Sequence, residues 1–169
     1  MALGGVLSAL IVALLYFAGI SEVASLSVLA AAGLILCLCV LECGIRYAAV
    51  SYAATAILSL VLCADKITAF FYITFFGIYS ILKAVFEMKI RQRVAEWLLK
   101  FGCFNLSLLA MLVISKLLVA DLGILTKLPW FAWAGGWILL NGVFLLYDIA
   151  ITRVITFYAF RLRRRLFRK

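Results

Sequence analysis

Long apolar runs alternate along the chain with short clusters of charged residues, glycine or proline. A helix needs about 20 residues to cross the roughly 30 Å hydrocarbon core of a bilayer. The apolar runs come close to that length, and the polar clusters mark their ends. The pattern predicts an all-α integral membrane bundle of about six transmembrane helices. The predicted spans are 2–20, 25–44, 47–63, 67–86, 99–119 and 129–150.

The region 25–63 could form one long apolar helix instead of two spans. It is nearly twice as long as a bilayer requires, and Arg46 near its centre would be costly in hydrocarbon unless it reached an interface. We therefore expect a tight hairpin at 44–46. The strands of a membrane barrel would alternate in polarity over about ten residues, which these unbroken runs do not do.

The composition indicates that lipid is the solvent. Hydrophobic residues make up 69% of the 169 residues, charged residues make up 14%, and there is one proline. This leaves too little polar surface to cover a water-soluble domain of this size. In hydrocarbon each backbone N–H and C=O needs a partner within the protein, which a helix provides. We predict a single transmembrane domain, 1–169, without a separate soluble domain.

Basic residues are unevenly distributed, and their distribution predicts the orientation. Loops retained on the cytoplasmic side carry an excess of Lys and Arg. With six spans, thirteen of the sixteen Lys and Arg residues fall on one side of the membrane, and the other three are Lys66, Lys116 and Lys127. We therefore expect both termini in the cytoplasm. The protein would be a multi-pass protein of the cell membrane, in a bacterium.

The two ends of the chain and one linker add detail. No Lys or Arg precedes the first apolar run, so we interpret this run as the first helix and not as a removable signal peptide. The tail 153–169 mixes basic and apolar residues, which suits contact with anionic lipid headgroups; the alternative is a stop-transfer anchor. The linker 87–100 contains Trp97 and the pair Glu96 and Lys100, which predicts a short interfacial helix.

Ionisable residues within a span are candidate functional residues, because a charge in lipid is expensive. Glu42 and Arg46 are four residues apart, which predicts one shared helix face and an ion pair at the inner end of the second span. Lys83 and Glu87 repeat this spacing in the fourth span. For both pairs the alternative to a functional role is a structural salt bridge.

Polar residues also occur in the fifth and sixth spans. Asp148 lies near the inner end of the sixth span, with Arg153 one to two turns away, and would cap or neutralise that end of the bundle. Asn105 and Asn141 lie deeper, where an amide normally faces another helix. We expect hydrogen bonds between helices from both amides, and a ligand contact is the alternative.

The residue types give little support for catalysis. The chain has no histidine, and its cysteines form no C-x-x-C pair, so a metal or redox site is not indicated. No span carries the clustered aspartates that hold magnesium, and the serines lack a partner base. We expect no enzymatic activity and interpret the cysteines as small core residues. They are Cys37, Cys39, Cys43, Cys63 and Cys103.

Three tryptophans follow Pro129 at spacings of three and four residues, which aligns them in one stripe down the sixth span. The fourth span is also rich in aromatic residues. An interfacial belt with aromatic packing is the structural interpretation, but a belt explains only the outermost tryptophan. If the two stripes converge, they form an apolar pocket that opens outward and carries a few polar groups. The candidate ligand-binding residues are Tyr72, Phe76, Lys116, Trp130, Trp133, Trp137 and Asn141.

Small residues recur at every fourth position of the first span, at Gly5, Ala9 and Ala13. This spacing lets the backbone of another helix approach closely, which is how membrane helices associate. With six spans, 169 residues and cytoplasmic termini, the pattern resembles the substrate-binding S components of energy-coupling factor (ECF) vitamin transporters. The resemblance implies that the face with Ala9 and Ala13 docks onto a transmembrane coupling subunit. It also implies that the last three helices hold a substrate near the outer side.

The resemblance leads to a hypothesis of function. The chain would be a passive subunit that binds a small solute, flat or apolar, and hands it to an ATP-driven partner module for uptake. It has no P-loop pattern, so ATP hydrolysis would belong to the partner. The alternative is a non-transport scaffold or assembly subunit that binds other membrane proteins. Neither hypothesis needs a cofactor, a metal or a nucleic acid.

Overall fold

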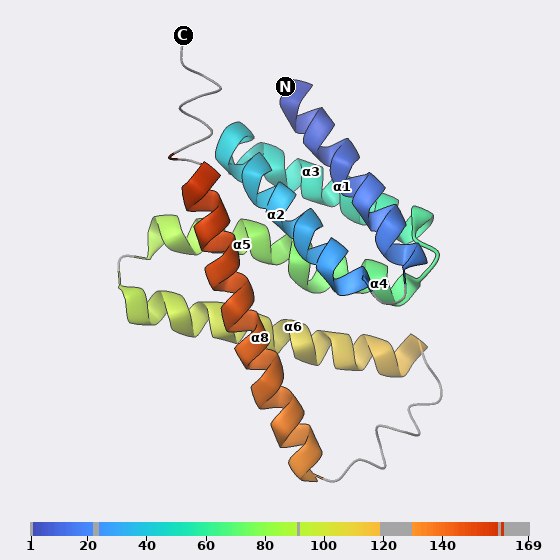
Figure 1. The fold of residues 1–169 in the computed structure, drawn as a ribbon, viewed down its shortest axis with the longest axis vertical. Coiled ribbons are helices and arrows are strands. Elements are labelled where there is room, and N and C mark those ends of the chain that lie inside the picture. The colour runs from blue at the N-terminus through green and yellow to red at the C-terminus, as the bar shows by residue number, and fades with distance from the viewer. Residues whose placement is uncertain (1, 22–23, 91, 119–129, 159, 161–169) are drawn as a thin grey trace. The chain divides into compact units, whose positions relative to one another are not determined.

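A computed structural model describes residues 2–21, 24–90, 92–118, 130–158 and 160 (Figure 1). Within these ranges the chain is almost entirely helical, and six helices are long and apolar enough to cross a membrane. The predicted all-α bundle with six candidate spans is therefore confirmed. The predicted cytoplasmic location of both termini stays a prediction, as do the type of membrane and its bacterial origin.

The chain divides by its internal contacts into two units, Met1–Ala120 and Asp121–Lys169, and each is described by itself. The predicted single domain, 1–169, stays a prediction. The second unit contains α8, Trp130–Phe157. The first unit contains α1 Ala2–Ile20, α2 Ser25–Cys43, α3 Ile45–Leu62, α4 Lys66–Phe71, the π-helix η1 Tyr72–Gly77, α5 Ile78–Lys89 and α6 Arg93–Leu118.

The fourth span is the centre of the first unit. It consists of α4, η1 and α5 in sequence, and it packs against α2, α3 and α6, while α1 packs mainly against α2 and α3 (Figure 1). The turn between α3 and α4 lies close to the end of α1, because a Cβ added at Gly19 would be 3.2 Å from the backbone nitrogen of Ala64. Fully buried apolar residues of this core include Ile11, Leu15, Leu29, Ala32, Leu36 and Tyr79.

Gly44 forms the predicted hairpin between the second and third spans. Its φ of 86° and ψ of 164° lie in a region that only glycine adopts readily, so α2 ends at Cys43 and α3 begins at Ile45. The hairpin is confirmed. The prediction that Glu42 and Arg46 share one helix face is wrong, because Gly44 reverses the chain between them and places them on different helices.

The linker between the fourth and fifth spans is shorter than predicted. Helix α5 continues to Lys89 and α6 begins at Arg93, so a separate interfacial helix within 87–100 is wrong. The reason is that no glycine or proline interrupts 93–101, and the pair Glu96 and Lys100 supports a helix that runs directly into the apolar span. Helix α8 likewise extends past the predicted end at 150, to Phe157.

Asp65 caps the N-terminus of α4. Its carboxylate accepts hydrogen bonds from the backbone nitrogens of Ile67 (3.0 Å) and Thr68 (3.1 Å) and from the Thr68 hydroxyl (2.5 Å). Partial burial acts to raise the pKa of Asp65, but these hydrogen bonds together lower it below its ordinary value. The folded protein therefore favours the ionised carboxylate, and the cap fixes the start of the fourth span.

We expect Asp65→Ala to destabilise the protein by about 1 kcal/mol at neutral pH, because two backbone N–H groups lose their acceptor. Since the pKa is lower in the folded state, this stabilisation is present above the unfolded pKa of about 4 and is lost as the pH falls through the folded pKa. Thermal unfolding in detergent between pH 7 and pH 3 measures this. The difference between wild type and Asp65→Ala shrinks on acidification, whereas the difference between Asp65→Asn, which keeps an acceptor, and Asp65→Ala stays constant, because neither of these side chains titrates. A constant difference for Asp65→Ala would contradict the assignment.

Candidate functional site

The π-helix η1 is the first notable feature of the fourth span. A π-turn shifts the backbone hydrogen bonds to a spacing of five residues and disturbs the regular helical ladder. Side chains of two other helices bond to its carbonyl oxygens. The Tyr52 hydroxyl of α3 donates to the carbonyl of Ile73 at 2.7 Å, and the Ser107 hydroxyl of α6 donates to that of Thr74 at 3.0 Å. Thr74 in turn donates to the Phe70 carbonyl of its own helix.

Tyr72 begins η1 and is fully buried. Its hydroxyl lies 2.9 Å from Oγ1 of Thr55, which is also fully buried. Thr55 Oγ1 lies within hydrogen-bond distance of the Ser51 carbonyl as well, at 2.9 Å, so Thr55 can donate to its own helix and accept from Tyr72. The ring of Tyr72 also lies near the ring of Tyr52, with centroids 6.2 Å apart. These contacts attach Tyr72, the first residue of η1, to α3.

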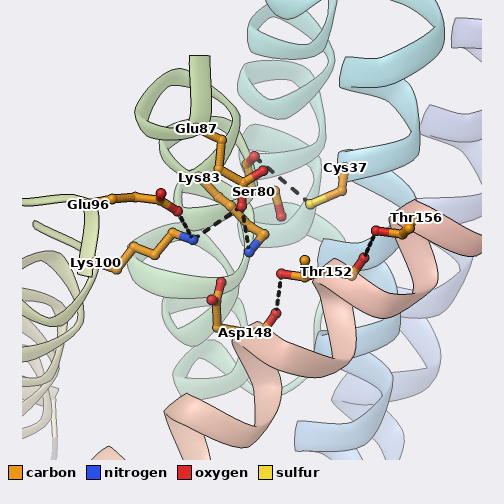
Figure 2. A network of polar contacts seen from close by, with 9 residues as sticks. All are labelled: Cys37, Ser80, Lys83, Glu87, Glu96, Lys100, Asp148, Thr152 and Thr156. Carbon is orange, nitrogen blue, oxygen red and sulfur yellow. Dashed lines mark hydrogen bonds and ion pairs between the residues drawn. The ribbon is translucent and has the colours of Figure 1, made fainter. Parts of the chain in front are cut away.

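A cluster of four charged residues joins α5 to α6, and we call it the charged cluster: Lys83, Glu87, Glu96 and Lys100 (Figure 2). Glu87 Oε1 lies 3.0 Å from Lys83 Nζ and 3.2 Å from Lys100 Nζ. Lys100 Nζ also lies 2.6 Å from Glu96 Oε1 and 5.7 Å from the ring centroid of Trp97. The two lysine side chains are only 1% and 4% exposed, whereas Glu87 and Glu96 are 38% and 20% exposed.

Two of these ion pairs were expected from their spacing. The i,i+4 pairs Lys83–Glu87 and Glu96–Lys100 are confirmed. The contact between Glu87 and Lys100 was missed, because it crosses the break between α5 and α6 and has no helical periodicity. Two acidic and two basic groups balance in charge, which lowers the cost of placing lysines in an apolar protein.

Ser80 lies one turn before Lys83 and connects α5 to α2. Its hydroxyl is 2.8 Å from the Gly33 carbonyl of α2 and 2.9 Å from the Phe76 carbonyl of its own span. The Cys37 thiol of α2 lies 3.9 Å from the Ser80 carbonyl oxygen (Figure 2). Sequence reasoning missed Ser80, Tyr52, Thr55 and Ser107, because a small hydroxyl in an apolar run gives no signal of its partner.

The candidate ligand-binding residues are distributed over both units. Tyr72 and Phe76 are buried in the first unit, within η1. In the second unit, Trp133 is exposed on α8, and the half-buried Asn141 donates its side-chain amide to the Trp137 carbonyl at 2.8 Å. The side chains of Lys116 and Trp130 lie outside the described residues. The pocket therefore stays a prediction.

The candidate docking residues share one exposed face of α1. Gly5, Ala9 and Ala13 are all exposed, and a Cβ added at Gly5 would meet nothing within 4 Å. The buried residues of α1 lie on the opposite side of the helix and include Ile11 and Leu15. The internal packing of the described chain therefore leaves the small-residue face of α1 uncovered.

The remaining polar candidates have the following positions. Glu42 is partly exposed at the end of α2 and Arg46 is exposed at the start of α3. Asn105 donates to the Phe101 carbonyl of its own helix at 2.8 Å. In α8 the Asp148 carbonyl accepts a bond from Thr152 at 2.8 Å, and Arg153 is exposed; Figure 2 also draws this part of α8. The basic tail beyond 160 lies outside the described residues.

These features define the class of protein: an integral membrane protein with a polytopic helical fold. Comparisons of the chain with protein-family models, with curated proteins and with solved structures give no match.

Proposed function

We propose that this protein is a membrane-embedded substrate-binding subunit for the uptake of a small solute, and that it works with an ATP-driven partner module. The observation that carries the proposal is the uncovered face of α1 formed by Gly5, Ala9 and Ala13. In lipid, apolar surface alone does not drive helices together, and small residues promote association by letting backbones approach closely. A partner's transmembrane helix would pack on this face.

The position of the face supports docking of a separate protein. Helix α1 already packs against α2 and α3 through its other side, so the small residues are not needed for the fold of the first unit. The solute-binding part of the proposal rests on the aromatic residues of α8, such as Trp133. Such side chains suit a flat or apolar molecule, with Asn141 as a polar contact.

We expect Ala9→Leu and Ala13→Leu to abolish most association with the partner module. Each added side chain would hold the two backbones apart, and overpacking of this kind reduces binding by roughly fivefold or more. The measurement is copurification with a co-expressed ATP-driven coupling module from detergent. Ala54→Leu is the matched control, because Ala54 is exposed on the neighbouring helix α3. Unchanged association of both α1 variants would remove the proposal.

A non-transport scaffold is the second candidate, and one observation favours it. The ring and hydroxyl of Tyr72 are occupied by contacts with α3, so this candidate ligand residue has a structural role. A scaffold would use the same face of α1 but bind no solute. Native mass spectrometry of gently extracted protein separates the two: a bound small molecule favours uptake, and a stable helical partner without one favours a scaffold.

A further inference from the structure

The fourth span changes its helical register at η1, Tyr72–Gly77, between two α-helical segments. A π-turn accommodates one more residue than an α-turn and occurs rarely, as a single turn, often at functional sites. It persists only where the surroundings compensate for its less favourable geometry. The compensating contacts here come from other helices.

Tyr52 of α3 provides two of these contacts. Its hydroxyl donates to the Ile73 carbonyl at 2.7 Å, within the π-turn. Its ring occupies the space beside Gly77, where an added Cβ would lie 2.5 Å from Cε2 of Tyr52. From the other side, Ser107 of α6 donates to the Thr74 carbonyl at 3.0 Å. The π register is thus held by groups that a continuous α-helix would not need.

The register determines which face α5 presents to its neighbours. One residue of an α-helix corresponds to about 100° of rotation and about 1.5 Å of rise. In the present register α5 directs Ser80 to the Gly33 carbonyl of α2. It also directs Glu87 to Lys100 of α6, as Figure 2 shows. If the π-turn became α-helical, α5 would rotate by about one residue. Tyr79 would then take the place of Ser80 against α2.

We propose that η1 is a register switch, in which the fourth span alternates between its π-turn and a continuous α-helix. In the α register, α5 rotates, Ser80 leaves Gly33, and the contact between Glu87 and Lys100 opens. Tyr52 sets the balance, because it stabilises the π register by both its hydroxyl and its ring. A change at the aromatic segment 72–77 is thereby transmitted along the span to the charged cluster. This inference does not rest on the proposed uptake function.

Disulfide cross-linking to the native Cys37 distinguishes the two registers. The Ser80 side chain faces α2, because its hydroxyl lies 2.8 Å from the Gly33 carbonyl, one turn before Cys37, and the Cys37 thiol lies 3.9 Å from the Ser80 carbonyl oxygen. Ser80→Cys therefore reports the π register. Tyr79→Cys reports the α register, in which residue 79 faces α2. The background replaces Cys39, Cys43, Cys63 and Cys103 by alanine, and the full chain is oxidised in native membranes with copper phenanthroline. The yield of each cross-link is read with and without Tyr52→Phe.

We expect Tyr52→Phe to raise the Tyr79→Cys cross-link by roughly fivefold, which is the population change that one net hydrogen bond produces. Tyr47→Phe is the matched control, because Tyr47 lies on the same helix and is exposed; it leaves both yields unchanged. If Tyr79→Cys fails to fold, a second test uses the Ser80→Cys protein. In that protein, Tyr52→Phe combined with Gly77→Ala is expected to lower the yield of the Ser80→Cys cross-link, which reports the π register, to less than half. If the folded proteins show the Ser80→Cys cross-link undiminished and no gain at position 79, there is no register switch.

Discussion

Glu87→Ala is expected to lower the free energy of unfolding by about 3 kcal/mol. The substitution removes an anion from beside two buried ammonium groups, since Glu87 Oε1 lies 3.0 Å from Lys83 Nζ and 3.2 Å from Lys100 Nζ. Breaking a buried ion pair from one side costs about 3–5 kcal/mol. We place the effect at the lower end, because Glu87 is 38% exposed and Lys100 keeps Glu96 at 2.6 Å.

The measurement is reversible unfolding in mixed micelles, with helicity as the signal. Glu87→Gln keeps the size of the side chain but not its charge, and it separates the loss of packing from the loss of the anion. The double variant Lys83→Met with Glu87→Ala is expected to recover much of the stability, because an apolar pair can replace a buried ion pair. Lys89→Ala is the surface control, at an exposed position of the same helix.

A loss for Glu87→Ala within about 0.5 kcal/mol of the Lys89→Ala effect would contradict this prediction, because that is the ordinary range of surface substitutions. The effect of Glu87→Ala also bears on how α5 and α6 pack against each other. Helix α5 ends at Lys89 and α6 begins at Arg93, and the ion pair of Glu87 with Lys100 is one of the contacts that hold these two helices together.

The membrane spans could be predicted from the sequence because their signal is local. Length and polarity alone locate an apolar run between interfaces, and the first span agrees with α1 at both ends. The hairpin at Gly44 was also predictable from a local signal, because Arg46 is costly in hydrocarbon and needs to reach an interface. The pairs of charged residues within α5 and α6 follow from helical spacing, which again involves only neighbours in sequence.

The register change in the fourth span could not be predicted in this way. Residues 70–79 are almost wholly apolar, so this stretch has no polar face whose shift around the helix would reveal an inserted residue. The π-turn accepts hydrogen bonds from Tyr52 and Ser107, which are distant in sequence and become partners only after the helices pack. The failed prediction for Glu42 and Arg46 has a related cause. Four-residue spacing implies a shared face only within one helix, and Gly44 ends that helix.

The aromatic residues show most clearly that one sequence pattern is compatible with two structural roles. A tyrosine in an apolar span has the same sequence signature whether it lines a ligand pocket or fills a core. Tyr72 was a candidate for the first role, and the structure gives it contacts of the second kind with Thr55 and Tyr52. The two roles predict different mutational effects, because a residue that fills a core stabilises the fold in the absence of any ligand.

Tyr72→Ala is therefore expected to destabilise the protein by about 3 kcal/mol without any added ligand. The side chain is fully buried, and its removal leaves a cavity beside α3. The unfolded helices remain in an apolar medium, so the loss comes from packing more than from transfer out of water, and we expect the lower end of the range for aromatic-to-alanine changes. Tyr47→Ala, at a tyrosine that is 55% exposed on α3, is the matched control with a small effect.

Tyr72→Phe isolates the hydroxyl, and we expect a loss of about 1 kcal/mol because Thr55 Oγ1 loses its partner at 2.9 Å. Thr55→Val removes the other half of the contact. In a double-mutant cycle the two losses are not additive if the hydroxyls bond to each other, because the second substitution then has no bond left to break. Additive losses, or a Tyr72→Ala protein as stable as the Tyr47→Ala control, would contradict the structural role of Tyr72 and leave it among the candidate ligand-binding residues.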